Sequence, residues 1–367
     1  KYGFEIENSE VVIENCTATR CTHTGLRAHN SNVTLNRGFM AYRNYEMVSR
    51  GVGYLNDRIP TVVSQGLHAV NSNVTLSASI FQDIGLPVDS PFSFCRNAVG
   101  VELENSTLNT PKDAWHKFNM EGVSNGDANM GEETIVLQTF QNSEVGLLGK
   151  SSVISTGKRI SSFENKVGIS LDGCTLEATE LCVDHNQERG LATKNSSVTY
   201  HYNNQAFTET GPFYPITNFF MNGQHAYLDS SQFMPTLVSG MDKIFDRLEF
   251  SGTFGIEERI SNGTTKQSLP SVVVDNGSYL QAVACKNTNI TSKTNSTSFL
   301  TAQGFGVRGS EFQVTNGSKL DLIGIGDDAT FVTGPQNWKK QQRVCSIYAG
   351  EGSYIHISGP TAITQTG

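Results

Sequence analysis

The chain contains 367 residues, with 27 Lys and Arg against 35 Asp and Glu, which gives a formal net charge of −8. This acidic balance, without a basic cluster along the sequence, argues against nucleic-acid binding. Charged residues make up only 17%, glycine numbers 35, and no apolar run is long enough to span a membrane as a helix, so neither a helical bundle nor membrane insertion is expected.

One sequence pattern recurs from the beginning of the chain to its end. It reads Gly-h-x-h-x-Asn-Ser-x-h-x-h, in which h is usually apolar and other small residues replace Asn or Ser in some copies. Seven copies begin at Gly3, Gly25, Gly66, Gly100, Gly146, Gly168 and Gly190. A looser eighth copy begins at His225, and three copies with a longer turn follow at residues 274–280, 314–320 and 349–355. Eleven copies of one unit predict a single domain over residues 1–367.

Each copy is expected to form two short β-strands joined by a tight corner. Apolar and polar residues alternate on both sides of the corner, and Asn, Gly and Ser suit corners because they tolerate left-handed backbone or bond to it. Two such strands cannot bury an apolar face alone, so the copies should stack in parallel. The side chains expected to point inward are Leu26, Leu67, Val101, Ile169, Leu191, Val33, Val74, Leu108, Leu176 and Val198.

A further string precedes several copies and suggests a third side to each coil. An aromatic or apolar residue is followed by Asn and then by the Gly of the next copy, as in Phe94, Asn97 and Gly100 or Phe163, Asn165 and Gly168. This string resembles the coils of right-handed parallel β-helices of the pectin-lyase-like type. The resemblance implies an all-β, three-sided, right-handed parallel β-helix with about 22 residues per minimal coil. Inserted loops are expected around residues 36–65, 111–140, 200–224 and 236–270, and the longer gaps leave room either for these loops or for extra coils.

Pectin-lyase-like folds include polysaccharide hydrolases and lyases, so catalytic residues have to be considered. The candidates are Asp327 and Asp328, because Gly326-Asp327-Asp328 resembles the Gly-Asp-Asp element of polygalacturonase-type hydrolases. The Asn-Thr-Asp, Gly-His-Gly and Arg-Ile-Lys strings of that family do not occur in this sequence. The eight histidines fall in different slots of the repeat. We therefore expect an acidic loop at Asp327 and Asp328, no catalytic site, no metal and no cofactor.

The cysteines form no CxxC motif and no zinc-like ligand set, which predicts reduced thiols that pack as small apolar groups. Cys16 with Cys21, or Cys174 with Cys182, could form a disulfide only if the fold placed them together.

An aromatic-rich segment interrupts the repeat between the copies at Gly190 and His225. Its candidate recognition residues, for a partner chain or for sugar rings, are Tyr202, Phe213, Tyr214, Phe219 and Phe220. The alternative is that these rings only pack the segment against the side of the coil.

These observations lead to a functional expectation by analogy of fold. A chain that starts at Lys1 without Met is expected to be a fragment of a longer polypeptide. Asn-rich β-helices with inserted loops look like those of bacteriophage tail spikes, tail fibres and other virion proteins. We expect a structural or adhesive rod located in a virion, forming a homotrimer and contacting cell-surface polysaccharide. The alternatives are a polysaccharide-degrading enzyme and a bacterial surface adhesin, at the cell surface or secreted.

Overall fold

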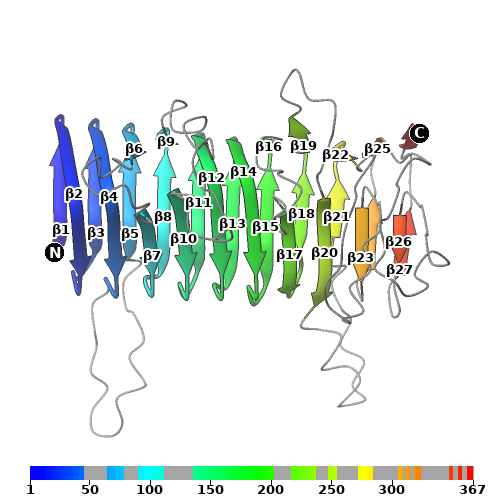
Figure 1. Cartoon of the computed structure of the whole chain (residues 1–367), viewed down its shortest axis with the longest axis horizontal. Helices are drawn as coiled ribbons and strands as arrows, with labels where there is room; N and C mark the ends of the chain where they lie inside the picture. Colours follow the sequence, from blue (N-terminus) through cyan, green and yellow to red (C-terminus); the bar gives the residue numbers. More distant parts are fainter. Residues whose placement is uncertain are drawn as a thin grey trace, which may run out of the picture.

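A computed structural model describes residues 1–44, 64–77, 90–110, 135–201, 216–236, 247–253, 272–283, 305–308, 311–314, 318–323, 347–349, 354–357 and 362–366. Every element in this part of the chain is a β-strand, and every pairing between strands is parallel. Figure 1 shows the strands side by side along the longest axis, with the N-terminus at one end of the row and the C-terminus at the other. No helix that could cross a membrane is present among these residues.

The first sheet has eleven strands and receives one strand from each coil. In spatial order they are β1 (Tyr2–Glu7), β3 (Thr24–His29), β5 (Gln65–Val70), β8 (Val99–Glu104), β11 (Val145–Lys150), β13 (Val167–Asp172), β15 (Arg189–Lys194), β18 (Ala226–Asp229), β21 (Val272–Asp275), β24 (Glu311–Val314) and β27 (Tyr354–Ile357).

The second sheet has seventeen strands and forms two sides of each coil. Its strands are β2 (Glu10–Thr19), β4 (Asn32–Tyr42), β6 (Asn73–Ser77), β7 (Ser90–Cys95), β9 (Thr107–Asn109), β10 (Ile135–Phe140), β12 (Val153–Phe163), β14 (Thr175–Asp184), β16 (Ser197–His201), β17 (Ile216–Asn222), β19 (Gln232–Thr236), β20 (Arg247–Thr253), β22 (Tyr279–Val283), β23 (Phe305–Arg308), β25 (Lys319–Ile323), β26 (Ile347–Ala349) and β28 (Ala362–Thr366). Long strands such as β2 and β12 run through both sides and shift register between them, at Glu14/Cys16 and Thr156/Arg159.

The core is made of apolar columns in which each side chain pairs with its counterpart on the next coil. Leu26 pairs with Leu67 and Leu67 with Val101 in the first sheet, and Val33 pairs with Val74 in the second. All ten side chains expected to point inward are buried, with at most 1% of their surface exposed. The direct pairing of β3 with β5 shows that the long gap between their copies holds no extra coil in this sheet.

The first corner of each coil is held by a column of serines. Asn8, Asn30 and Asn71 adopt left-handed backbone there, each with a φ of 49°, and a serine follows each of them; Ser31 and Ser72 are buried. The Ser31 hydroxyl donates to the carbonyl of His29 (2.8 Å) and accepts from the backbone N–H of Ser9 on the preceding coil (3.1 Å). The same pair of bonds recurs up to Ser278, with Cys174 in one place. Each hydroxyl thus satisfies a backbone group that the turn leaves without a strand partner.

A second column, of buried asparagines, lies at the corner that leads back to the first sheet. Asn142 accepts from the backbone N–H of Asn97 (3.0 Å) and donates to the carbonyl of Phe94 (3.1 Å), so that its amide binds the preceding coil twice. The remaining members repeat this arrangement: Asn44, Asn97, Asn165, Asn186 and Asn222. Asn97, Asn142, Asn165 and Asn186 are the asparagines of the string that precedes a glycine in the sequence, and the structure adds Asn44 and Asn222 to the same column.

The glycine of each copy is required by close packing between coils. A Cβ built on Gly100 would lie 2.5 Å from the carbonyl oxygen of Gly146 on the next coil, which is far too close for a side chain. His225 stands in this slot in the eighth copy, next to buried Asn222.

Two expectations about the chain are wrong in detail. Parts of the ranges expected as inserted loops form strands, namely the end of β4 and all of β10, β17 and β20, because the third side of the coil is built from them. The copy at residues 349–355 is also out of register. Ala349 pairs with Val307 and Ile355 with Phe312, so that turn connects a different pair of sides.

Cys16, Cys21, Cys95, Cys174 and Cys182 form no disulfide bond with one another, as expected from their spacing. Burial raises the pKa of the Cys95 thiol to about 11, so the thiol stays protonated near neutral pH and packs as an apolar group.

Placing a charge in a core column should prevent folding, because an unpaired carboxylate would be buried in an apolar environment. We expect Val198→Asp to lose more than about 3 kcal/mol of stability and to accumulate as insoluble protein. Val153→Asp is the matched control, since Val153 lies in the same sheet but is 46% exposed. A soluble Val198→Asp protein with wild-type circular dichroism would refute the inward register.

The asparagine column should contribute to stability through its hydrogen bonds between coils. Asn165→Ala removes an acceptor for the Asn142 N–H (3.0 Å) and a donor to the Thr139 carbonyl (3.0 Å), both buried. Urea unfolding should show a loss of about 1–3 kcal/mol. Asn32→Ala, which removes an exposed amide, should change stability by much less, and equal losses in the two variants would contradict the assignment.

Candidate functional site

The outer face of the first sheet carries the charged residues of the repeat in two rows. The residues two and four positions after each glycine point outward, because those one and three positions after it point into the core. The row nearer the first corner alternates in sign along Glu104, Lys150, Asp172 and Lys194 on successive strands. Opposite charges on neighbouring parallel strands attract, so this row supports the register.

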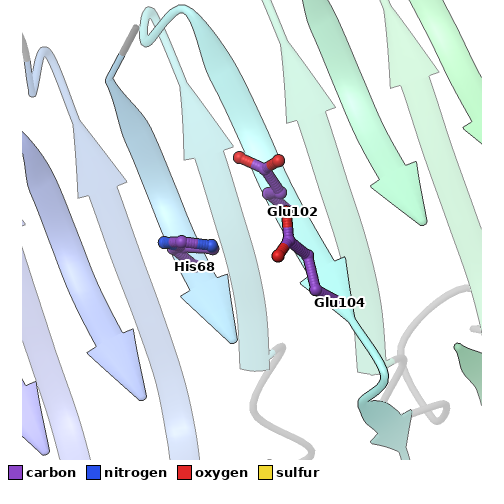
Figure 2. A group of neighbouring side chains, drawn as sticks. All are labelled: His68, Glu102 and Glu104. Atoms are coloured by element: carbon purple, nitrogen blue, oxygen red, sulfur yellow. The ribbon is translucent and has the colours of Figure 1, made fainter. Parts of the chain in front are cut away.

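The most enclosed part of this face is a cluster formed by β5, β8 and β11. His68 lies on β5, beside Glu102 and Glu104 on β8, as Figure 2 shows. The ligand-capable atoms of these three side chains lie within 4.8 Å of one another. The Glu102 side chain is only 10% exposed, although it points away from the core.

Glu102 is ionised and fully paired in this cluster. The Lys150 ammonium donates to Glu102 (2.9 Å) and to Glu104 (3.0 Å), and the Gln65 amide donates to the other Glu102 oxygen (3.0 Å). Burial alone would raise the pKa of Glu102, but the hydrogen bonds from Lys150 and Gln65 outweigh it and hold the pKa below its usual value. The bond to Glu102 raises the pKa of Lys150 in turn.

His68 is the uncharged member of the cluster. Burial lowers its pKa more than the charges of Glu102 and Glu104 raise it, so the imidazole is neutral near pH 7. Its Nε2 atom is buried without a hydrogen-bond partner among the described residues.

One imidazole and two carboxylates form a ligand set suited to a divalent cation. The Lys150 ammonium already lies against both carboxylates, so an ion would have to displace it. Glycoside hydrolysis needs one carboxyl group that stays protonated near neutral pH, with a raised pKa. Glu102 has a lowered one, so the cluster has the electrostatics of an ion network in which one lysine binds two glutamates, and Glu102 does not have the raised pKa of a general acid.

The candidates named from the sequence lie elsewhere. Asp327 and Asp328, together with Tyr202, Phe213 and Tyr214, are outside the described residues. Phe220 lies on β17, and Phe219 on the same strand is fully buried with its ring 6.1 Å from that of Phe233. Phe219 therefore has the packing role given above as the alternative to recognition.

The sequence alone does not reveal this cluster through its histidines, because the eight histidines occupy different slots of the repeat. His68 and Glu102 occupy the same slot, two residues after Gly66 and Gly100. Comparing unlike residues within one slot of successive copies would have revealed the pair.

Comparison of the chain with protein-family models, with curated proteins and with solved structures gives no match.

Removing the lysine should make stability depend on pH in a defined direction. In the wild type, the lowered pKa of Glu102 favours folding at neutral pH, and this contribution is lost as the pH falls through the folded-state value. In Lys150→Met the buried carboxylate has lost its cation, so its pKa rises and its ionisation opposes folding. Urea unfolding should show a deficit of about 1–2 kcal/mol near pH 7 that shrinks near pH 3.

Lys194→Met is the control for this prediction, because Lys194 lies 3.6 Å from Asp172 and both side chains are more than half exposed. It should show little change at either pH. A Lys150→Met deficit that is independent of pH would mean that the cluster does not act through Glu102 ionisation.

Proposed function

We propose that the chain is a right-handed parallel β-helix of the pectin-lyase-like type. It serves as a structural or adhesive rod of a virion, such as a bacteriophage tail spike or fibre. The eleven-stranded parallel sheet supports the architecture, since each coil returns to the same sheet in the same direction. Connections between parallel strands of one sheet are right-handed in nearly all proteins, which supports a right-handed winding of the β-helix.

The observation that carries the proposal is the continuity of the columns between coils. The serine column runs from Ser9 to Ser278, and the asparagine column runs from Asn44 to Asn222, with hydrogen bonds at each step. Each coil is thereby bonded to the next through its corners as well as its strands, which stiffens the stack along its axis. A rod needs this property, whereas an enzyme needs a polarised site on the surface.

The outer charges support the same proposal. Lys150 binds Glu102 and Glu104, and Arg27 binds Glu5 and Glu7 at 2.6 and 3.3 Å, so these cations of the outer face are already paired with carboxylates. Polysaccharide degradation is the alternative, as a hydrolase or lyase acting through residues such as Asp327 and Asp328. A bacterial surface adhesin would use the same rod. In the virion proposal, three copies associate side by side and the assembly contacts cell-surface polysaccharide.

The enzymatic alternative is tested by turnover. Incubation of the purified protein with pectate, alginate and hyaluronan should release no reducing ends and no unsaturated uronates above the buffer blank. Activity that disappears in Asp327→Ala, Asp328→Ala or Glu102→Gln would contradict the rod proposal and favour the enzyme.

The virion assignment is tested on particles. Mass spectrometry of gradient-purified particles from the source culture should detect the chain, and antibodies against it should label an appendage in electron micrographs. Detection only in cell-envelope fractions would favour the adhesin instead.

A further inference from the structure

Left-handed backbone recurs at the first corner and at the corner before the buried asparagine column, and different residues occupy the two. Asn15 and Arg37 also adopt it, at the bend between the two sides of the second sheet. The first corner uses residues for which this conformation is inexpensive, mainly asparagine, as at Asn8, Asn30 and Asn71. At the other corner, before the buried asparagine column, the residues with positive φ are Arg20 (59°), Arg43 (53°), Arg96 (54°), Gln141 (55°), Glu164 (56°) and His185 (49°).

This difference indicates that the side chains, and not the backbone preference, explain which residues occupy the second corner. Left-handed backbone costs about 1–2 kcal/mol for a residue with a long side chain. Asn or Gly would relieve that cost, as the first corner shows, yet three successive coils carry arginine. Backbone demands alone do not account for this choice.

The three arginines form a column along the axis of the stack. The backbone N–H groups of Arg20, Arg43 and Arg96 each donate to a strand end of the following coil, at Tyr42, Cys95 and Phe140. Neighbouring members are therefore about 4.8 Å apart in the backbone, the spacing of parallel strands.

The positive charge of this column is not neutralised within the part of the chain that the structure describes. Arg27 and Arg37 bind glutamates there, but Arg20, Arg43 and Arg96 form no ion pair with a described carboxylate. Arg20 and Arg96 are exposed, and Arg43 is half-buried. The column is a local cationic surface on a chain of net charge −8.

Neutral partners hold the guanidinium groups of the column in place. Arg96 donates to the Tyr42 hydroxyl (2.8 Å) and to the Gln141 amide oxygen (2.7 Å). The guanidinium carbons of Arg43 and Arg96 lie 4.8 and 5.5 Å from the centre of the Tyr42 ring. These contacts order the cations without cancelling their charge.

Aromatic rings continue the same outward row. Tyr42 pairs with Cys95, Cys95 with Phe140 and Phe140 with Phe163 on successive strands. The rings of Phe140 and Phe163 are stacked at 4.9 Å with an interplanar angle of 1°, and both are half-buried.

We propose that Arg20, Arg43 and Arg96, with Tyr42, form a binding site for a linear polysaccharide that carries carboxylate or sulfate groups. Guanidinium groups bind such anions in two-point geometry, and ring faces next to them stack on sugar rings. One cation per coil matches a polymer with a regular, short repeat. Nucleic acid fits less well, because three cations on an acidic protein release few counterions. The proposal deepens the adhesive part of the proposed function and rests on it.

The test measures retention of the full chain on immobilised polysaccharides. Heparin represents sulfate, hyaluronan and alginate represent carboxylate, and dextran is the neutral control. The test variant replaces Arg20, Arg43 and Arg96 with Gln, because Gln141 shows that glutamine fits this slot. The control variant replaces Arg27, Arg37 and Lys166 with Gln, which removes the same charge from groups already paired with glutamates.

The wild type and the control variant should bind at least one anionic polysaccharide and not dextran. Binding should weaken with salt, and the test variant should bind at least about 10-fold more weakly, for two or three lost charged hydrogen bonds. Unchanged melting temperatures would show that the loss is not due to unfolding. Heparin-only or uronate-only binding identifies sulfate or carboxylate as the recognised group.

Three results would overturn the proposal. They are no wild-type retention on any anionic polysaccharide, equal weakening in the two variants, and tighter binding to single-stranded DNA than to every polysaccharide. The virion assignment fails separately, through the particle experiment. If the chain is absent from particles but its arginine-dependent retention persists, the polysaccharide-binding site remains supported and only the virion assignment is rejected.

Discussion

The structure depends on satisfying backbone groups at the corners of stacked coils. Strand ladders satisfy the backbone along the sides, but at each corner the chain turns and the ladder is interrupted. Ser72 accepts there from the backbone of the coil before it while donating to its own coil, and Asn142 binds the coil before it twice. Because an unsatisfied buried backbone group costs about 1–3 kcal/mol, these residues recur in coil after coil.

The same constraint explains why glycine lies where the second corner joins the first sheet. The buried asparagine leads the chain into close contact with the next coil, and at Gly100 only a residue without Cβ avoids the carbonyl of Gly146. Serine, asparagine and glycine therefore belong to one packing arrangement. The apolar columns fill the space that this arrangement encloses.

Because the inward side chains of each coil pack in the core, only the outward side chains can bind a ligand or carry charge. The first sheet pairs its cations with carboxylates, as Lys150 pairs with Glu102 and Glu104. The second corner does not, since Arg20, Arg43 and Arg96 form no ion pair with a described carboxylate. The outer face of the first sheet therefore uses its charges to support the strand register, whereas the second corner has positive charge available for a ligand.

The sequence by itself determined the repeating unit, the parallel stacking and the inward residues, because each slot contacts the same slot of the next copy. Val33 and Val74 are recognisable from alignment alone, since they are alike and lie opposite each other. The tertiary structure alone decided which unlike residues meet. His68 joins Glu102 and Glu104 only because the gap between Gly66 and Gly100 contains no extra coil. The arginine column was hidden in the same way, since segments of unequal length separate Arg20, Arg43 and Arg96 from the glycines that follow them. Stacking aligns corners in space whatever length of chain lies between them, and sequence spacing does not record that alignment.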